Sequence, residues 1–237
     1  MSLDFSILLD NWELLAQGLW MTIFICSTSL ILALAGGSVL ALARLSRLRS
    51  LNYAGVAYIE LFRNVPFLIQ VFLWYYVLPF YGIRLPTTAV GIVALSSFAS
   101  AYYAEIIRGA IQSVPSGQLE SARATGMSYF QSMRYIIFPQ MMGYLIPLAT
   151  NQSTSLVKES SLLSTITVME LTMATQRVQA LAFSHVEVLI SAALIYWAIN
   201  SLLSFASRRL EMSLQRYKLS KAASAAGQVA ALERATT

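Results

Sequence analysis

The stretch LLAQGLWMTIFICSTSLILALAGGSVLALA, residues 14–43, decides the class of fold, because none of its 30 residues is Asp, Glu, Lys or Arg. A helix needs about 20 predominantly apolar residues to cross the hydrocarbon core of a bilayer. The whole chain is 57% hydrophobic and only 11% charged, whereas an ordinary soluble domain carries about 25% charged residues. The sequence therefore predicts a membrane protein whose first span is this stretch.

Four more windows, further along the chain, also lack acidic and basic side chains: 64–83, 85–104, 135–157 and 188–207. Each is long enough for a membrane-spanning helix. The strands of a membrane β-barrel alternate polar and apolar residues, and these windows do not. We therefore expect an all-α integral membrane protein with five transmembrane helices, contained in a transmembrane domain of residues 1–215.

Lysine and arginine are distributed unequally between the two faces that five spans define. One face carries 13 of the 16 basic residues, in segments 44–63, 105–134 and 208–237. The opposite face carries only Arg84, Lys158 and Arg177. Cytoplasmic loops of membrane proteins are enriched in Lys and Arg, so we place the N-terminus outside and the C-terminus in the cytoplasm. Residues 216–237 are then a cytoplasmic tail, which we expect to be disordered.

The composition excludes several kinds of chemistry. Cys26 and His185 are the only residues of their types, which is too few for a His/Cys metal site. None of the three lysines follows a glycine, so the chain has no Gly-Lys-Ser/Thr phosphate loop. We expect no catalytic site, metal or cofactor, and if ATP drives this protein, another chain binds it. The net charge of +5 follows from basic cytoplasmic loops beside anionic lipid and gives no support to nucleic-acid binding.

The loop between the third and fourth windows is the most informative part of the chain. The breaker PSG, residues 115–117, precedes a short helix with Glu120 near its positively polarised end, and Gly126 ends that helix. Ser128 and Gln131 have the spacing of a capping box, which predicts a second short helix. The resulting helix-turn-helix elbow has an apolar side suited to docking a soluble partner. That side consists of Leu119, Ala122, Met127, Phe130 and Met133.

The elbow resembles the EAA loop of importer-type ABC transporter permeases. The matching pattern is Glu120-Ser121-Ala122, three residues, Gly126, nine residues, Ile136, one residue and Phe138-Pro139. The stretches YIELFRNVP (58–66) and AYYAEIIRGAIQSVP (101–115) resemble, more narrowly, permeases for polar amino acids of the histidine, glutamine and glutamate/aspartate type. The likeness covers about residues 15–215.

The resemblance implies a multi-pass permease of the bacterial plasma membrane that imports a polar amino acid, with a slight lean to glutamate and aspartate. It implies several partners: two ABC ATPase subunits, a second permease subunit of the same or similar sequence, an external solute-binding protein and the membrane lipid. In that family the loop, here about residues 115–139, forms the coupling helix that sits on the ATPase. By motif match, Glu120, Ala122 and Gly126 are the coupling residues, with Leu119 and Met127 beside them. The alternative is an amphipathic helix on the membrane surface.

The fourth window contains a run of polar side chains. Residues 150–155 read TNQSTS, and Lys158 and Glu159 follow. Polar groups are costly against lipid and usually face a bundle interior or a water-filled path. We expect Asn151, Ser155, Lys158 and Glu159 to line or gate the path of a zwitterionic amino acid. The alternative is hydrogen bonding between helices together with a Lys158/Glu159 ion pair.

Two smaller patterns predict packing contacts. The small residues at 36–38 allow another helix to approach closely. Glu60 with Arg63, and Glu105 with Arg108, have the i,i+3 spacing of structural ion pairs.

A different class of transporter remains as the alternative function. A secondary transporter would couple amino acid uptake to protons through Glu105, Glu159 or Glu170. Such proteins commonly contain internal repeats, which we do not detect here, and they need no docking elbow. An intramembrane enzyme is a more distant alternative, because one His and one Cys make a catalytic constellation hard to assemble.

Overall fold

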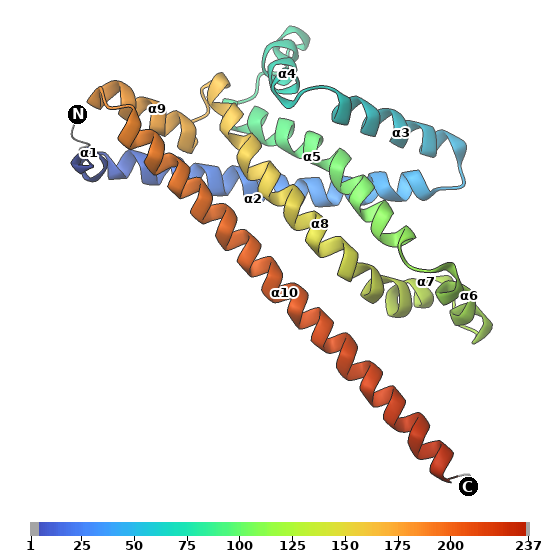
Figure 1. Ribbon diagram of the computed structural model, residues 1–237. Coiled ribbons are helices and arrows are strands. Elements are labelled where there is room, and N and C mark those ends of the chain that lie inside the picture. Colours follow the sequence, from blue (N-terminus) through green and yellow to red (C-terminus); the bar gives the residue numbers. More distant parts are fainter. Residues whose placement is uncertain (1–4, 236–237) are drawn as a thin grey trace. The chain divides into compact units, whose positions relative to one another are not determined.

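The structure, a computed structural model, describes residues 5–235, with side chains described for residues 5–213. The chain forms two compact units: unit 1 comprises residues 1–109 and 151–201, and unit 2 comprises residues 110–150 and 202–237. All regular elements of the described residues are helices (Figure 1), as the predicted all-α class requires. They are α1 (Ser6–Asp10), α2 (Trp12–Leu45), α3 (Arg49–Asn64), α4 (Phe67–Phe72), the π-helix η1 (Leu73–Val77), the 3₁₀ helix η2 (Leu78–Tyr81), α5 (Thr87–Gln112), α6 (Ser116–Ala124), α7 (Tyr129–Ser132), the π-helix η3 (Met133–Ile137), α8 (Phe138–Glu159), the 3₁₀ helix η4 (Ser160–Ile166), α9 (Leu171–Ala182) and α10 (Val186–Ala235).

Three helices of the described residues are each long and apolar enough to cross a membrane. They are α2, α5 and residues 186–213 of α10, with 34, 26 and 28 residues. Each exceeds the roughly 20 residues that a hydrocarbon core requires. They coincide with three of the five charge-free windows.

The second window, 64–83, is not a single straight helix. Helix α3 and the helical segment 67–81 meet at a bend of 107°. Val65 is extended, with φ −92° and ψ 130°, because the Pro66 ring disfavours the helical region for the residue before it. The bent pair amounts to one further span if both arms belong to it, which brings the described residues to three or four candidate spans.

The fourth window lies in α8, which is not among these candidates. Its 22 residues correspond to about 33 Å of helix at 1.5 Å per residue, so its length is sufficient. Its polar run, 150–155, lowers its average hydropathy instead. The count of five spans thus stays a prediction.

Within unit 1, small residues bring α2 close to α5 and α9. A Cβ added to Gly37 would lie 2.6 Å from the Tyr103 Cβ of α5. A Cβ added to Gly18 would lie 2.5 Å from the Ala174 Cβ of α9. Both distances are too short for real side chains, so glycine is what permits this packing. The predicted close approach at residues 36–38 is confirmed.

The connection between α8 and α10 buries an acid. Glu170 is 0% exposed, and its carboxylate caps α9 by accepting bonds from the amides of Thr172 (2.9 Å) and Met173 (2.8 Å). The Tyr196 hydroxyl donates to the same carboxylate at 2.8 Å. Burial raises the pKa of Glu170 above its ordinary value, and these hydrogen bonds oppose the rise. A capping role thus accounts for an acid that the proton-coupled alternative uses as a carrier.

The last helix extends into the segment expected to be disordered. The backbone of α10 is helical as far as Ala235, whereas residues 236–237 of the predicted tail lie outside the described residues. An Ala-rich sequence without proline has a high helix propensity, which accounts for the helical backbone.

Candidate functional site

In unit 2, α6 ends in a Schellman turn where the sequence predicts the elbow. The Met127 amide donates to the Ala122 carbonyl at 3.1 Å. The Gly126 amide donates to the Arg123 carbonyl at 3.0 Å, which completes the pair of bonds that defines this motif. Gly126 has φ +84°, in the left-handed region that glycine enters without steric cost. The prediction that Gly126 ends the helix is confirmed.

The chain enters a new helix directly after this turn. The Ser128 hydroxyl accepts from the Gln131 amide (3.2 Å), and the Gln131 side chain accepts from the Ser128 amide (2.8 Å). This reciprocal pair is the predicted capping box. Helix α7 then continues through the π-helical η3 into α8 with helical backbone angles at both junctions. The second arm of the elbow is therefore the beginning of a long helix.

Most of the predicted docking side faces inward. Ala122 is 5% exposed, and Leu119 and Met133 pack against a buried cluster. The cluster consists of Ala110, Val114, Ile137 and Met141. Met127 is half-buried, which leaves Phe130 as the one exposed member of the five predicted apolar residues, at 74%. The elbow uses its apolar side chains to hold α6 against η3 and α8, because burying them there removes apolar surface from water.

The exposed face of the elbow carries charged and aromatic side chains. Glu120 and Arg123 are exposed on α6, and Tyr129 and Phe130 are 65% and 74% exposed on α7. Glu120 is not in the first turn of α6, so the predicted stabilisation of its charge by the helix dipole is weaker than expected. Tyr129 was not among the residues predicted for docking, although its position directly after the capping Ser128 places it at the start of the second arm.

The polar run of α8 is divided between different faces of the helix. Ser153 is buried, and its hydroxyl lies 2.8 Å from the Tyr103 hydroxyl of α5, within unit 1. Thr150 bonds back to the Ile146 carbonyl of its own helix at 2.8 Å. Asn151 and Ser155 are exposed. The Thr150 hydroxyl also shares a hydrogen bond with the Ser207 hydroxyl of α10, within unit 2. Hydrogen bonding between helices, the alternative explanation of the run, therefore holds for Thr150 and Ser153.

Three of the four predicted path residues share one exposed face of α8. Asn151, Ser155 and Lys158 are spaced four and three residues apart, which aligns them along the helix, and all three are exposed. Glu159 is half-buried beside them. No ion pair of the described residues joins Lys158 to Glu159, because adjacent helical residues point in different directions. A polar face of this kind is unfavourable against lipid.

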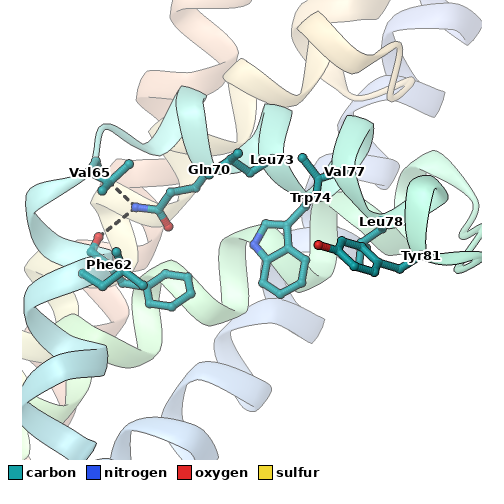
Figure 2. Close-up of a pocket in the computed structure, with 9 residues that line it drawn as sticks. Phe62, Val65, Gln70, Leu73, Trp74, Val77, Leu78 and Tyr81 are labelled. Carbon is teal, nitrogen blue, oxygen red and sulfur yellow. Dashed lines mark hydrogen bonds between the residues drawn. The ribbon is translucent and has the colours of Figure 1, made fainter.

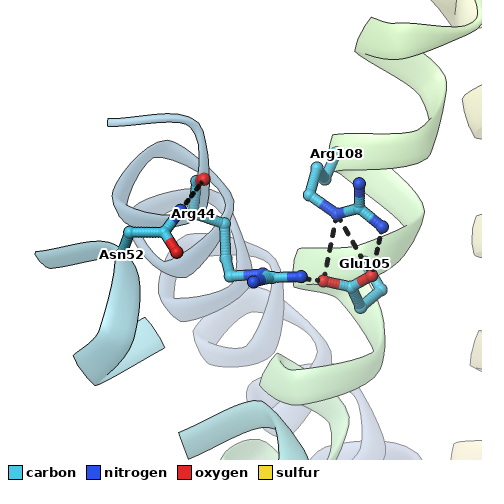
Figure 3. A network of polar contacts seen from close by, with 4 residues as sticks. All are labelled: Arg44, Asn52, Glu105 and Arg108. Carbon is cyan, nitrogen blue, oxygen red and sulfur yellow. Dashed lines mark hydrogen bonds and ion pairs between the residues drawn. The ribbon is translucent and has the colours of Figure 1, made fainter. Parts of the chain in front are cut away.

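Figure 3 shows an ionic network in unit 1 that joins α2 to α5. Arg108 Nη2 lies 2.6 Å from Glu105 Oε2, and Arg44 Nε lies 3.3 Å from Glu105 Oε1. The Asn52 amide of α3 donates to the Arg44 carbonyl. The predicted pair of Glu105 with Arg108 is confirmed, and Arg44, which is far away in sequence, joins it without having been predicted. This network ties the carboxylate of Glu105 to two cations, an arrangement unsuited to carrying protons.

The second predicted pair does not form. Glu60 accepts from the Asn64 side chain at 2.8 Å. Arg63 lies over the Tyr102 ring, 5.3 Å from its centroid, in a cation–π contact. Both Glu60 and Arg63 are exposed, where an ion pair contributes little.

The chain is similar to known permeases over most of its length. Residues 33–216 match the family described as binding-protein-dependent transport system inner membrane component. The chain is 37% identical to the "probable glutamine ABC transporter permease protein GlnM" of Bacillus subtilis (strain 168), with 90% of this chain and 99% of that protein covered. It is 32% identical to the glutamate/aspartate import permease protein GltK of Escherichia coli O157:H7, over 87% of this chain and 97% of that protein.

A solved structure gives the same result. The chain is similar to a crystal structure of an amino acid ABC transporter with histidines, with a TM-score of 0.84, 32% identity, and coverage of 90% of this chain and 100% of that one. The proton-coupled alternative finds no support among these relatives. The match over residues 33–216 and the elbow of α6 and α7 together show that this chain belongs to the inner-membrane permease components of binding-protein-dependent ABC transporters.

Proposed function

We propose that this chain is the permease subunit of an ATP-driven importer of polar amino acids, in which the elbow couples the membrane helices to the ATPase. The observation that supports this most directly is the Schellman turn at Gly126. It fixes the angle between α6 and α7 and leaves Glu120 and Phe130 exposed to a partner. The chain has no phosphate loop of its own, so hydrolysis belongs to other subunits.

We place the substrate path along the exposed face of Asn151, Ser155 and Lys158, with Glu159 at its edge. Such a face requires water or another protein beside it. A second permease subunit of the same or similar sequence would cover it and enclose a polar path between the two. A preference for glutamate and aspartate is consistent with the exposed ammonium of Lys158, which would attract the side-chain carboxylate of these substrates. Relatives named for glutamine, cystine and arginine make a panel of amino acids the appropriate test.

We further propose five spans with the N-terminus outside and the C-terminus in the cytoplasm. In this arrangement α2, the segment 64–83, α5, α8 and α10 each cross once. Two ABC ATPase subunits bind the exposed elbow face, and a solute-binding protein delivers the amino acid from the outside. The unequal distribution of Lys and Arg supports this orientation, because 13 of the 16 basic residues lie in the segments that this topology places on the same face as the elbow.

The experiment is uptake in proteoliposomes that contain this chain with its co-expressed ATPase and binding protein. Labelled glutamate, aspartate, glutamine, histidine, arginine and cystine form the panel. Uptake of at least one of them should require both ATP and the binding protein. Uptake driven by a proton gradient without the ATPase would refute the proposal.

A further inference from the structure

A cavity of about 410 Å³ lies in unit 1 at the turn between the helical segment 67–81 and α5. Its volume falls within the range of about 300 to 1,000 Å³ that is usual for small-molecule sites. Three aromatic residues and one charged residue are among those that line it: Trp74, Tyr75, Tyr76 and Arg84. Neither the elbow nor the polar face of α8 contributes to it.

Arg84 has no counter-ion in the described part of the chain. No ion pair or hydrogen bond within residues 5–213 includes its side chain, and the residue is exposed. A guanidinium carries five N–H donors in a planar fork that matches the oxygens of a carboxylate or a phosphate. The cavity therefore offers an unpaired positive charge to an anionic ligand.

The neighbouring groups add hydrogen-bond donors and no negative charge. Helix α5 begins at Thr87, which also lines the cavity, and its first turn contains no acidic side chain. The backbone amides of residues 87–89 donate to no carbonyl of the described residues, and the first turn of a helix carries a partial positive charge. The rings of Tyr75 and Tyr76 pack edge-on with centroids 4.9 Å apart, and a phenol hydroxyl is able to donate to an anion.

The position of Arg84 in the sequence places it at the level of the lipid headgroups. It is the only charged residue between positions 64 and 104, and α5, a candidate span, begins three residues after it. Trp and Tyr are enriched at this level of a membrane. Trp74 and Leu78 line both this cavity and the apolar cavity drawn in Figure 2, so apolar side chains continue the wall beside the cation. An amphiphile fits this arrangement better than a small soluble anion, which has no apolar surface to bury there.

We propose that this cavity binds the headgroup of an anionic phospholipid, such as phosphatidylglycerol, with the phosphate paired to Arg84 beside the start of α5. The hydroxyls of Tyr75 and Tyr76 donate to oxygens of the headgroup, and the acyl chains continue along the apolar side chains. The proposal depends on neither the transported substrate nor the ATPase.

The test is quenching of Trp74 fluorescence by lipids with brominated acyl chains, since bromine quenches an indole only at close range. The full chain is reconstituted with Phe in place of the other three tryptophans, Trp12, Trp20 and Trp197, which are 61%, 69% and 68% exposed. Brominated phosphatidylglycerol and brominated phosphatidylcholine with the same chains are compared at equal, low mole fraction in phosphatidylcholine bilayers. We expect phosphatidylglycerol to bind about fivefold more tightly, the factor that corresponds to one arginine at an anionic membrane surface. Equal quenching by the two lipids would overturn the proposal, as would the absence of quenching, which would indicate that a partner protein covers the cavity.

Variants distinguish this site from general surface charge. Arg84→Gln should abolish the preference for phosphatidylglycerol, and Arg84→Lys should retain most of it. Arg177→Gln removes another exposed cation, at a position that does not line the cavity, and should leave the preference unchanged. Persistence of the preference in Arg84→Gln, or its loss in Arg177→Gln, would contradict the site.

Inorganic phosphate distinguishes a lipid from a soluble anion. Excess phosphate, compared with chloride at equal ionic strength, should leave the quenching by brominated phosphatidylglycerol unchanged. Relief of quenching by phosphate alone would show that the cavity takes a soluble anion, and the lipid site would be wrong.

Discussion

The hydroxyl groups of Tyr103 and Ser153 lie 2.8 Å apart and join α5 to α8 in the buried part of unit 1. This bond separates one serine of the polar run from the neighbours that face outward. Ser153 and Ser155 are two positions apart on α8, yet the first is buried and the second is exposed. The run therefore combines a structural contact with an exposed polar face.

We expect substitutions in the run to have two distinct effects. Ser153→Ala should lower the free energy of unfolding by about 0.5 to 1.5 kcal/mol, the usual contribution of one hydrogen bond, with uptake per folded complex retained. Asn151→Leu or Ser155→Leu should impair uptake and leave the unfolding temperature and subunit assembly close to wild type. Thermal unfolding and uptake measured on the same preparations distinguish the two classes. Normal transport kinetics in both leucine variants would exclude these residues from the path.

Gly126→Val should uncouple the ATPase from the membrane helices. A left-handed conformation costs an ordinary residue about 1 to 2 kcal/mol, and a β-branched one is a poorer fit still, so the turn should distort. The matched control is Gly109→Val, because Gly109 lies in a regular part of α5 with no atom near its added Cβ and no positive φ. ATP hydrolysis stimulated by loaded binding protein should fall strongly in Gly126→Val alone. Full stimulation together with tight ATPase binding in that variant would contradict the coupling role.

Glu105→Gln should be more destabilising than Glu60→Gln. Glu105 contacts two arginines and is partly shielded from water, whereas Glu60 is exposed and contacts Asn64. Loss of the network should lower stability by about 1 kcal/mol or more, against about 0 to 0.5 kcal/mol for an exposed pair. Thermal unfolding of both variants at equal ionic strength provides the comparison. Equal unfolding temperatures would show that the network contributes nothing to stability.

The buried carboxyl of Glu170 should make stability depend on pH. Its pKa is raised by burial, so between its unfolded and folded pKa values the folded protein binds the extra proton. The free energy of unfolding should then fall as pH rises from the ordinary Glu pKa, about 4.3, through the folded value. Glu170→Gln should have a flatter profile than wild type in unfolding experiments from pH 4 to 8. Parallel profiles would assign the pH dependence to other groups.

The proposed orientation can be tested with fusions to a reporter that is active only outside the cytoplasm. The reporter should be active when fused before Asn11 or near Gln176, and silent after Arg123 or Arg216, because basic loops remain in the cytoplasm. A cytoplasmic reporter such as a fluorescent protein, fused at the same positions, should give the opposite pattern. Activity of the external reporter after Arg123 would reverse the topology and the coupling assignment with it.

Local patterns were predictable from the sequence, and contacts between distant segments were not. Gly126 and the Ser128/Gln131 capping box depend on spacing within a few residues, and both occur as predicted. Arg44 lies 61 positions from Glu105, and no sequence spacing relates them. The inward side of Leu119 was not predictable either, because an amphipathic helix does not reveal whether its apolar face meets its own chain or a partner. The charge-free window 64–83 concealed the 107° bend at Pro66, because hydropathy carries no information about the direction of a helix.

The π-helical segment η3, Met133–Ile137, sets the rotational phase between the elbow and the long helix that follows it. A π turn accommodates an extra residue, and it precedes Pro139, which has no amide proton to offer an α-helical ladder. Removing one residue from this segment would restore the regular repeat and turn everything before it by about 100° around the helix axis. Tyr129 and Phe130 would then point toward a different side of the molecule with their own sequence unchanged. The direction in which Tyr129 and Phe130 point thus depends on the number of residues in η3, which has five, and not on which residues form the exposed pair.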